Sequence, residues 1–139
     1  MNDWQLAAVW IAVLVGVFVF APRLRRLAIP TTHVRDVVHI GAGAWIFAWP
    51  SWSAPTLPIA ITVAALVFVA AMPVLARRLH PFAAFRDAIA DEEERWGGIV
   101  LYVVSYAAFT AVGFLIDAFA ASAALASLSF GDGLGGAIG

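Results

Sequence analysis

Apolar segments long enough to cross a lipid bilayer dominate this chain. Residues 4–21 and 57–76 contain no charged side chain, and each run approaches the ~20 residues that a spanning helix needs. Hydrophobic residues make up 63% of the chain and charged residues only 12%, and so short a chain cannot bury that much apolar surface within itself. The sequence therefore predicts an integral membrane protein, folded as an all-α, polytopic bundle of transmembrane helices.

Three further apolar stretches bring the predicted number of apolar segments to about five. They cover residues 37–52, 98–116 and 118–130. The first and the last are short for a full span, so we expect them to be tilted, covered by neighbouring helices or only partly spanning. We expect residues 1–139 to form one transmembrane domain.

The positions of the basic residues predict the orientation of the helices. All eight basic residues are arginines, and they fall within residues 22–36 and 77–97. These are alternate connections, so the positive-inside rule predicts that both are cytoplasmic loops and that the N-terminus lies outside. We expect the membrane to be the plasma membrane of a prokaryote.

Composition also excludes several classes of function. The net charge is −1 and the arginines are few, which gives no basis for nucleic-acid binding. The chain has no cysteine, so disulfides, thiolate metal sites and cysteine nucleophiles are all excluded.

Two groups of apolar side chains are predicted to lie at the membrane–water interfaces. Phe82, Phe85 and Ile89 recur at helical spacing in the second cytoplasmic loop, which is typical of an amphipathic helix on the membrane surface. Three tryptophans near the outer end of the second segment are typical of an interfacial aromatic belt: Trp45, Trp49 and Trp52.

The first polar motif lies at the start of the second apolar segment. Arg35 and His39 are four residues apart, so on a helix they share one face. The planar guanidinium of arginine suits phosphate, and histidine can accept a proton or donate a hydrogen bond. Gly41 and Gly43 would let a helix or a ligand approach closely. The alternative is an interfacial arginine beside a histidine that is hydrogen-bonded inside the bundle.

The second motif is the acidic run that precedes the fourth apolar segment. Glu94 and Arg95 are its members closest to the membrane. We expect them to support the candidate site that contains Arg35 and His39. The alternative is that the whole run is the solvated face of a surface helix.

The third motif is the glycine-rich stretch around Asp132. Glycine backbones can present several N–H groups to one anion, and a carboxylate beside them could hold a phosphate-bound Mg²⁺. The candidate phosphate-binding residues are Gly131, Gly133, Gly135, Gly136 and Gly139. The alternative is a small-residue interface between helices.

Taken together and in order, these motifs resemble the polyprenol kinase family of membrane proteins. That family includes dolichol kinase and phytol kinase, and phosphatidate cytidylyltransferases are its relatives. Its Arg-Lys-x-x-His-x-x-x-Gly motif corresponds to residues 35–43, its Glu-Arg-x-x-Gly-x-x-x-Tyr element to residues 94–102, and its Gly-Asp-x-x-Ala-x-x-x-Gly loop to residues 131–139.

The chain departs from the family pattern in two places. Asp36 stands where the family usually has lysine, which is expected to set an anion beside the bound polyphosphate. The resemblance also covers only the N-terminal half of the usual family domain. The remaining basic elements are expected after Gly139, or in a separately encoded C-terminal half; a homo-oligomer is a further expectation.

The resemblance implies a membrane lipid kinase that uses CTP to phosphorylate a long-chain isoprenoid alcohol of the dolichol, polyprenol or phytol type. It assigns Asp132 to Mg²⁺ and to catalysis, and the surrounding glycine amides to phosphate. Arg35 would contact phosphate, and His39 would orient or deprotonate the alcohol. Two alternatives stay open: cytidylyl transfer from CTP to a lipid phosphate, and a non-catalytic, truncated membrane module.

Overall fold

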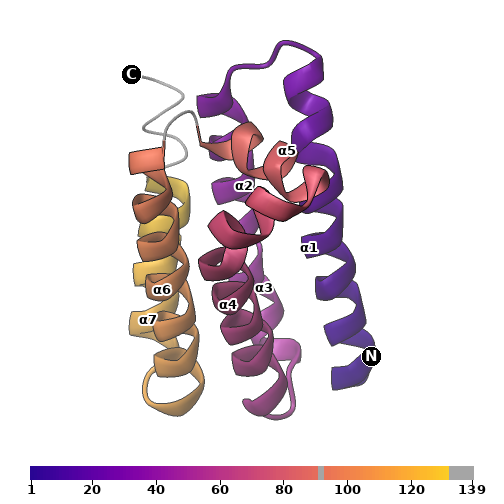
Figure 1. The fold of residues 1–139 in the computed structure, drawn as a ribbon. Coiled ribbons are helices and arrows are strands. Elements are labelled where there is room, and N and C mark those ends of the chain that lie inside the picture. The colour runs from indigo at the N-terminus through magenta and orange to yellow at the C-terminus, as the bar shows by residue number, and fades with distance from the viewer. Residues whose placement is uncertain (91–92, 132–139) are drawn as a thin grey trace.

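The protein is a bundle of helices (Figure 1). The computed structural model describes residues 1–90 and 93–131, and all regular structure within these ranges is helical. The predicted all-α class is therefore confirmed. Three helices are long and apolar enough to cross a membrane, namely α1 (Asp3–Arg26), α4 (Thr56–Arg78) and α6 (Glu93–Leu115). They indicate a membrane-embedded protein.

The second apolar segment is an interrupted helix. It consists of α2 (Thr31–Gly43), the single turn α3 (Trp45–Ala48) and the 3₁₀ turn η1 (Trp49–Ser51). The helix begins earlier than the apolar stretch at 37–52, because Pro30 starts it and the polar residues that follow join its first turns. Polar side chains are compatible with helix where a span leaves the membrane.

The last apolar segment is also short. It comprises α7 (Ala118–Ala126) and the π-helical turn η2 (Ser127–Gly131). Asp117 begins α7 as its N-cap, because its carboxylate accepts hydrogen bonds from the backbone N–H groups of Phe119 at 2.9 Å and Ala120 at 3.0 Å. This contact gives Asp117 a structural role.

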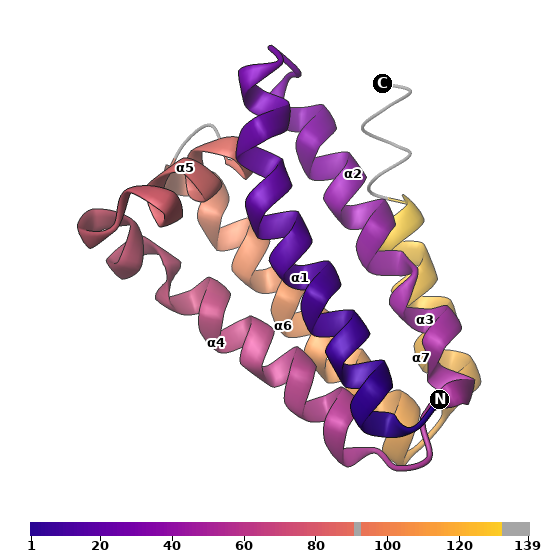
Figure 2. The same ribbon diagram turned by 90° about the vertical axis from the view of Figure 1, so that its right-hand side faces the viewer.

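Successive apolar segments run antiparallel, as both views of the ribbon show (Figure 2). Residues 27–30 and the short helix α5 (His80–Ile89) lie at one end of the bundle, which we call the arginine-rich end. The N-terminus and residues 52–55 lie at the opposite end. There, the Asp3 carboxylate accepts hydrogen bonds from the backbone N–H of Ser53 at 2.9 Å and its hydroxyl at 2.8 Å.

The tryptophans expected to form an outer belt are buried instead. Trp45, Trp49 and Trp52 are only 3%, 7% and 8% exposed, and they join one of the two core clusters. Trp45 donates a hydrogen bond from Nε1 to Thr110 Oγ1 at 3.2 Å. The belt prediction is wrong because the break in the second segment turns these rings toward α6 and α7, which cover them.

The helix α5 differs from its prediction in the same way. Its apolar positions recur at helical spacing as expected, but Phe85 and Ile89 are buried in the second core cluster. The Phe18 ring of α1 lies 5.0 Å from the Phe85 ring, centroid to centroid. The apolar face of α5 therefore packs on the bundle.

One glycine allows the interrupted segment to pack against α6. A Cβ atom at Gly113 would overlap the six-membered ring of Trp49. Because the Trp49 ring is almost fully buried, it has little room to move aside, and only glycine fits this crossing without a shift.

We predict that Gly113→Ala lowers the free energy of unfolding by about 1–3 kcal/mol, as overpacking does in other cores. Gly16→Ala is the matched control, because nothing lies within 4 Å of the position of its added Cβ; it should be neutral, or stabilising by about 0.5–1 kcal/mol. Tryptophan fluorescence during unfolding in detergent measures both. Equal effects of the two substitutions would contradict the predicted clash.

Candidate functional site

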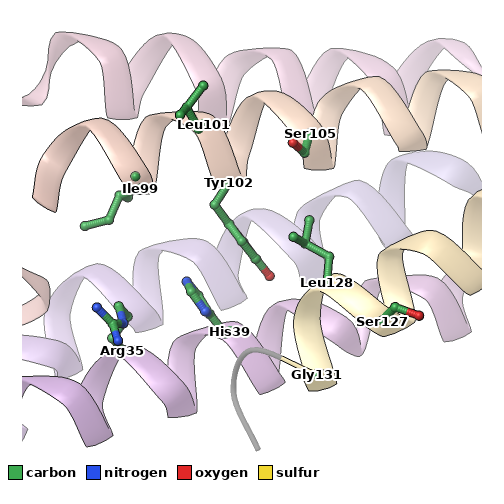
Figure 3. Close-up of a pocket in the computed structure, with 10 residues that line it drawn as sticks. Arg35, His39, Ile99, Leu101, Tyr102, Ser105, Ser127, Leu128 and Gly131 are labelled. Atoms are coloured by element: carbon green, nitrogen blue, oxygen red, sulfur yellow. The ribbon is translucent and has the colours of Figure 1, made fainter. Parts of the chain in front are cut away.

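A cleft of about 800 Å³ opens between α2, α6 and η2 (Figure 3). Each of these elements contributes lining residues, although the elements are far apart in the sequence. The residues that carry polar side chains or bare backbone are Arg35, His39, Gly98, Tyr102, Ser105, Ser127 and Gly131.

The helix α2 supplies the arginine and the histidine of the first motif. Arg35 and His39 both line the cleft, as expected for residues four apart on a helix. His39 is buried, and its ring stacks on the Tyr102 ring with 4.1 Å between centroids and 6° between planes. The Tyr102 hydroxyl lies 3.0 Å from Ser129 Oγ, within hydrogen-bonding distance. These contacts join α2, α6 and η2 at one point.

The described lining of the cleft is electropositive. Among the described residues, none accepts a hydrogen bond or forms an ion pair with the Arg35 guanidinium, and its Nε atom is buried. The same part of the lining includes no carboxylate. A charged guanidinium in such a setting favours an anionic ligand.

Asp36 does not lie where the family pattern predicts. It is only 4% exposed and does not line the cleft. The Nδ1 atom of His33, one turn earlier on α2, lies 3.8 Å from Asp36 Oδ2. Asp36 therefore does not add a carboxylate to the described lining of this cleft, because one residue along a helix turns the side chain to a different face; its position relative to a bound polyphosphate stays a prediction.

Two close contacts at the end of α2 hold this helix against η2 and α6, the other two elements of the cleft. The Phe130 ring comes to 2.7 Å from where a Cβ of Gly43 would stand. The Tyr106 hydroxyl donates a 2.6 Å hydrogen bond to the carbonyl oxygen of Ala42, in the last turn of α2. Gly43 thus permits the close approach that the sequence suggested, whereas no atom lies near the corresponding position at Gly41.

The cleft is recessed from the arginine-rich end. The helical segment Ala118–Gly131 begins at the opposite end and contains 14 residues by its bounds. At ~1.5 Å per residue it rises only about 21 Å, less than the ~30 Å of a hydrocarbon core. The end of η2 lies below the level that α2 reaches (Figure 2).

Several predicted site residues cannot be placed. Asp132, Gly133, Gly135, Gly136 and Gly139 lie outside the described residues, as do the side chains of Glu94 and Arg95, whose backbone belongs to the first turn of α6. Of the predicted set, Arg35, His39 and Gly131 come together in the cleft.

The structure also adds residues that the sequence analysis did not assign to the site. Tyr102 entered only as part of a motif, and Ser105 and Ser127 were not considered. Gly98, Tyr102 and Ser105 recur at helical spacing within an apolar span, and this polar stripe is the signal that could have identified the α6 wall.

The described part of the cleft fits an anion better than a bare metal ion. No cluster of three histidine, aspartate or glutamate side chains that could hold a metal exists among the described residues. The Mg²⁺ assigned to Asp132 stays a prediction, since that residue lies outside this part of the chain.

Comparisons of the chain with protein-family models, curated proteins and solved structures found no match. The resemblance to polyprenol kinases therefore depends on the three motifs alone.

We predict that water reaches the cleft at the depth of Ser105. Because the natural chain has no cysteine, Ser105→Cys provides a single thiol, and a charged methanethiosulfonate should modify it in nanodiscs, since reaction requires a hydrated thiolate. The neighbouring Val104→Cys is the matched control, because Val104 is exposed on the lipid-facing surface of α6 and does not line the cleft. Modification of both thiols at the same rate, or of neither, would contradict a hydrated cleft.

Proposed function

We propose that this protein is a lipid kinase that transfers the γ-phosphoryl group of CTP to a long-chain isoprenoid alcohol. The observation that carries the proposal is the meeting of Arg35, His39 and Gly131 in one cleft, because these residues come from motifs far apart in the sequence. The motif that starts near Glu94 also reaches the cleft through Tyr102.

The chemistry of the lining suits phosphoryl transfer. This reaction depends mainly on positioning and on neutralising charge on the transferred group. Arg35 would bind the phosphates, and His39 would accept the proton of the attacking hydroxyl. The alcohol oxygen would form a bond to the γ-phosphorus while the bond to the bridging oxygen breaks, which yields the lipid phosphate and CDP.

Tyr102 has a positioning role in this scheme. Stacking of its ring on His39 fixes the plane of the imidazole, and its hydroxyl is tied to Ser129. A fixed imidazole would hold its nitrogen at the attacking oxygen without the entropic cost of ordering it for each turnover.

Mg²⁺ would neutralise charge on the nucleotide phosphates, with Asp132 as the protein ligand. The steps above do not depend on where the metal binds, because the described lining already supplies a positive charge, that of Arg35, opposite the negative phosphates. Magnesium dependence is therefore a separate expectation that metal removal with a chelator would test.

The apolar residues of the cleft support a lipid as the acceptor. Apolar lining residues such as Ile99 and Leu101 accompany the polar ones, and Leu101 is largely exposed on the outer surface of α6. A lipid could therefore keep its chain in the bilayer while its hydroxyl enters the cleft. A water-soluble alcohol would not need such an apolar path beside the cleft.

The proposed orientation places the arginine-rich end in the cytoplasm, where nucleotides are available. The support is the positive-inside rule, applied to arginines that all fall within residues 22–36 and 77–97. A membrane-impermeant thiol reagent should label Ala54→Cys in intact cells, and should label Asp87→Cys only after permeabilisation. Both native residues are exposed, at opposite ends of the bundle; the reverse labelling pattern would overturn the orientation.

The activity is tested with α- and γ-labelled CTP, supplied in parallel to membranes that contain the protein. We predict label in the lipid fraction from the γ position only. Arg35→Gln and His39→Gln should each lower the rate by about 10²-fold or more, as loss of charge stabilisation or of a general base does elsewhere. Arg86→Gln is the matched control, because Arg86 belongs to the same end but does not line the cleft.

The other outcomes separate the alternatives. Label from the α position would identify a cytidylyltransferase acting on a lipid phosphate. Transfer of neither label would contradict the kinase proposal for this chain and favour a non-catalytic membrane module.

A further inference from the structure

A second groove lies between α1 and α5 at the arginine-rich end. Its volume is about 270 Å³, and it shares no lining residue with the cleft. The α1 side contributes Phe18, Val19, Pro22, Arg23 and Arg26. The α5 side contributes His80, Pro81 and Ala84.

The rim of this groove is cationic and has no counterion in the described part of the chain. Arg23 and Arg26 are exposed, and no described carboxylate forms an ion pair with either. The Arg23 guanidinium lies over the Phe20 ring, 5.2 Å from its centroid, a contact that leaves its hydrogen-bond donors available. His80 adds a third nitrogen-bearing side chain from the first turn of α5.

The floor of the groove is apolar and continues onto the lipid-facing surface of α1. Phe18 packs on the rings of Phe82 and Phe85 and closes the inner side. Val19 is 39% exposed and Phe20 is 60% exposed, so the outer side leads to side chains that face the acyl chains. A ligand that used both parts of the groove would need an anionic head and an apolar tail.

We propose that this groove binds an anionic phospholipid, with its phosphate among Arg23, Arg26 and His80 and an acyl chain along Val19 and Phe20. The charge of the rim selects the class of lipid. Zwitterionic lipids carry a quaternary or primary ammonium group that would need an acceptor, and the described lining offers cations and apolar groups but no carboxylate. Free phosphate would use only the rim and leave the apolar floor exposed. The site is independent of the proposed kinase activity.

Native mass spectrometry of the full chain in detergent tests this proposal. The protein is titrated with phosphatidylglycerol or with phosphatidylcholine, and inorganic phosphate is added as a competitor. The site variant is Arg23→Gln combined with Arg26→Gln. Its matched control is Arg25→Gln combined with Arg86→Gln, which removes the same charge from the same end outside the groove.

We expect the wild type to bind phosphatidylglycerol more tightly than phosphatidylcholine. Each arginine near an anionic lipid contributes about fivefold in affinity, so the site variant should lose up to about 25-fold. The control should change by less than about twofold, because its arginines lie outside the groove. Val19→Trp should also weaken binding by filling the floor without changing the charge.

Three results would overturn the proposal. Equal binding of the two lipids would remove the selectivity, and equal losses in the site variant and the control would show a general effect of charge. Complete displacement of phosphatidylglycerol by an equal concentration of inorganic phosphate would assign the rim to a small anion and not to a lipid.

Discussion

Packing of Phe130 on the bare backbone of Gly43 holds the end of the last segment against α2. The cleft depends on this contact, because η2 supplies one of its three walls. In the last turn of α2, next to Gly43, the Tyr106 hydroxyl also donates a hydrogen bond to the carbonyl oxygen of Ala42, which ties α6 to the same part of α2. The end of α2 is thus held by both α6 and η2, the two elements that form the cleft with it.

The gathering of the arginines at one end is the second organising constraint. The arginines gather at one end, whereas Asp3 and Asp117 lie at the other, where they bind backbone N–H groups. Each of these two carboxylates thus has a structural role. The cleft and the second groove both open there, and both combine a cationic part with an apolar part.

The sequence predicted the class of fold because apolar runs without charge have few ways to satisfy their backbone in lipid. It also placed Arg35 and His39 on one face, since helical spacing alone requires this. It could not predict the burial of Trp49, which depends on Gly113 in another helix. The burial of Asp36 away from the cleft and the contribution of Ser105 likewise depend on how α2 and α6 are rotated against each other. Spacing within one segment does not determine this tertiary property.

The short last segment has a consequence for the bilayer itself. Within the described residues, the stretch Ala118–Gly131 rises about 21 Å against a hydrocarbon core of ~30 Å. A span of that length would produce hydrophobic mismatch, and the surrounding membrane would thin beside it. Phe119, 84% exposed at the beginning of α7, presents this short surface to the lipid. Lipids next to α7 would then sit deeper than their neighbours, with their head groups drawn toward the level of Gly131. For the proposed lipid substrate, such thinning would shorten the path of its head group to the cleft through the shape of the membrane and without a moving part.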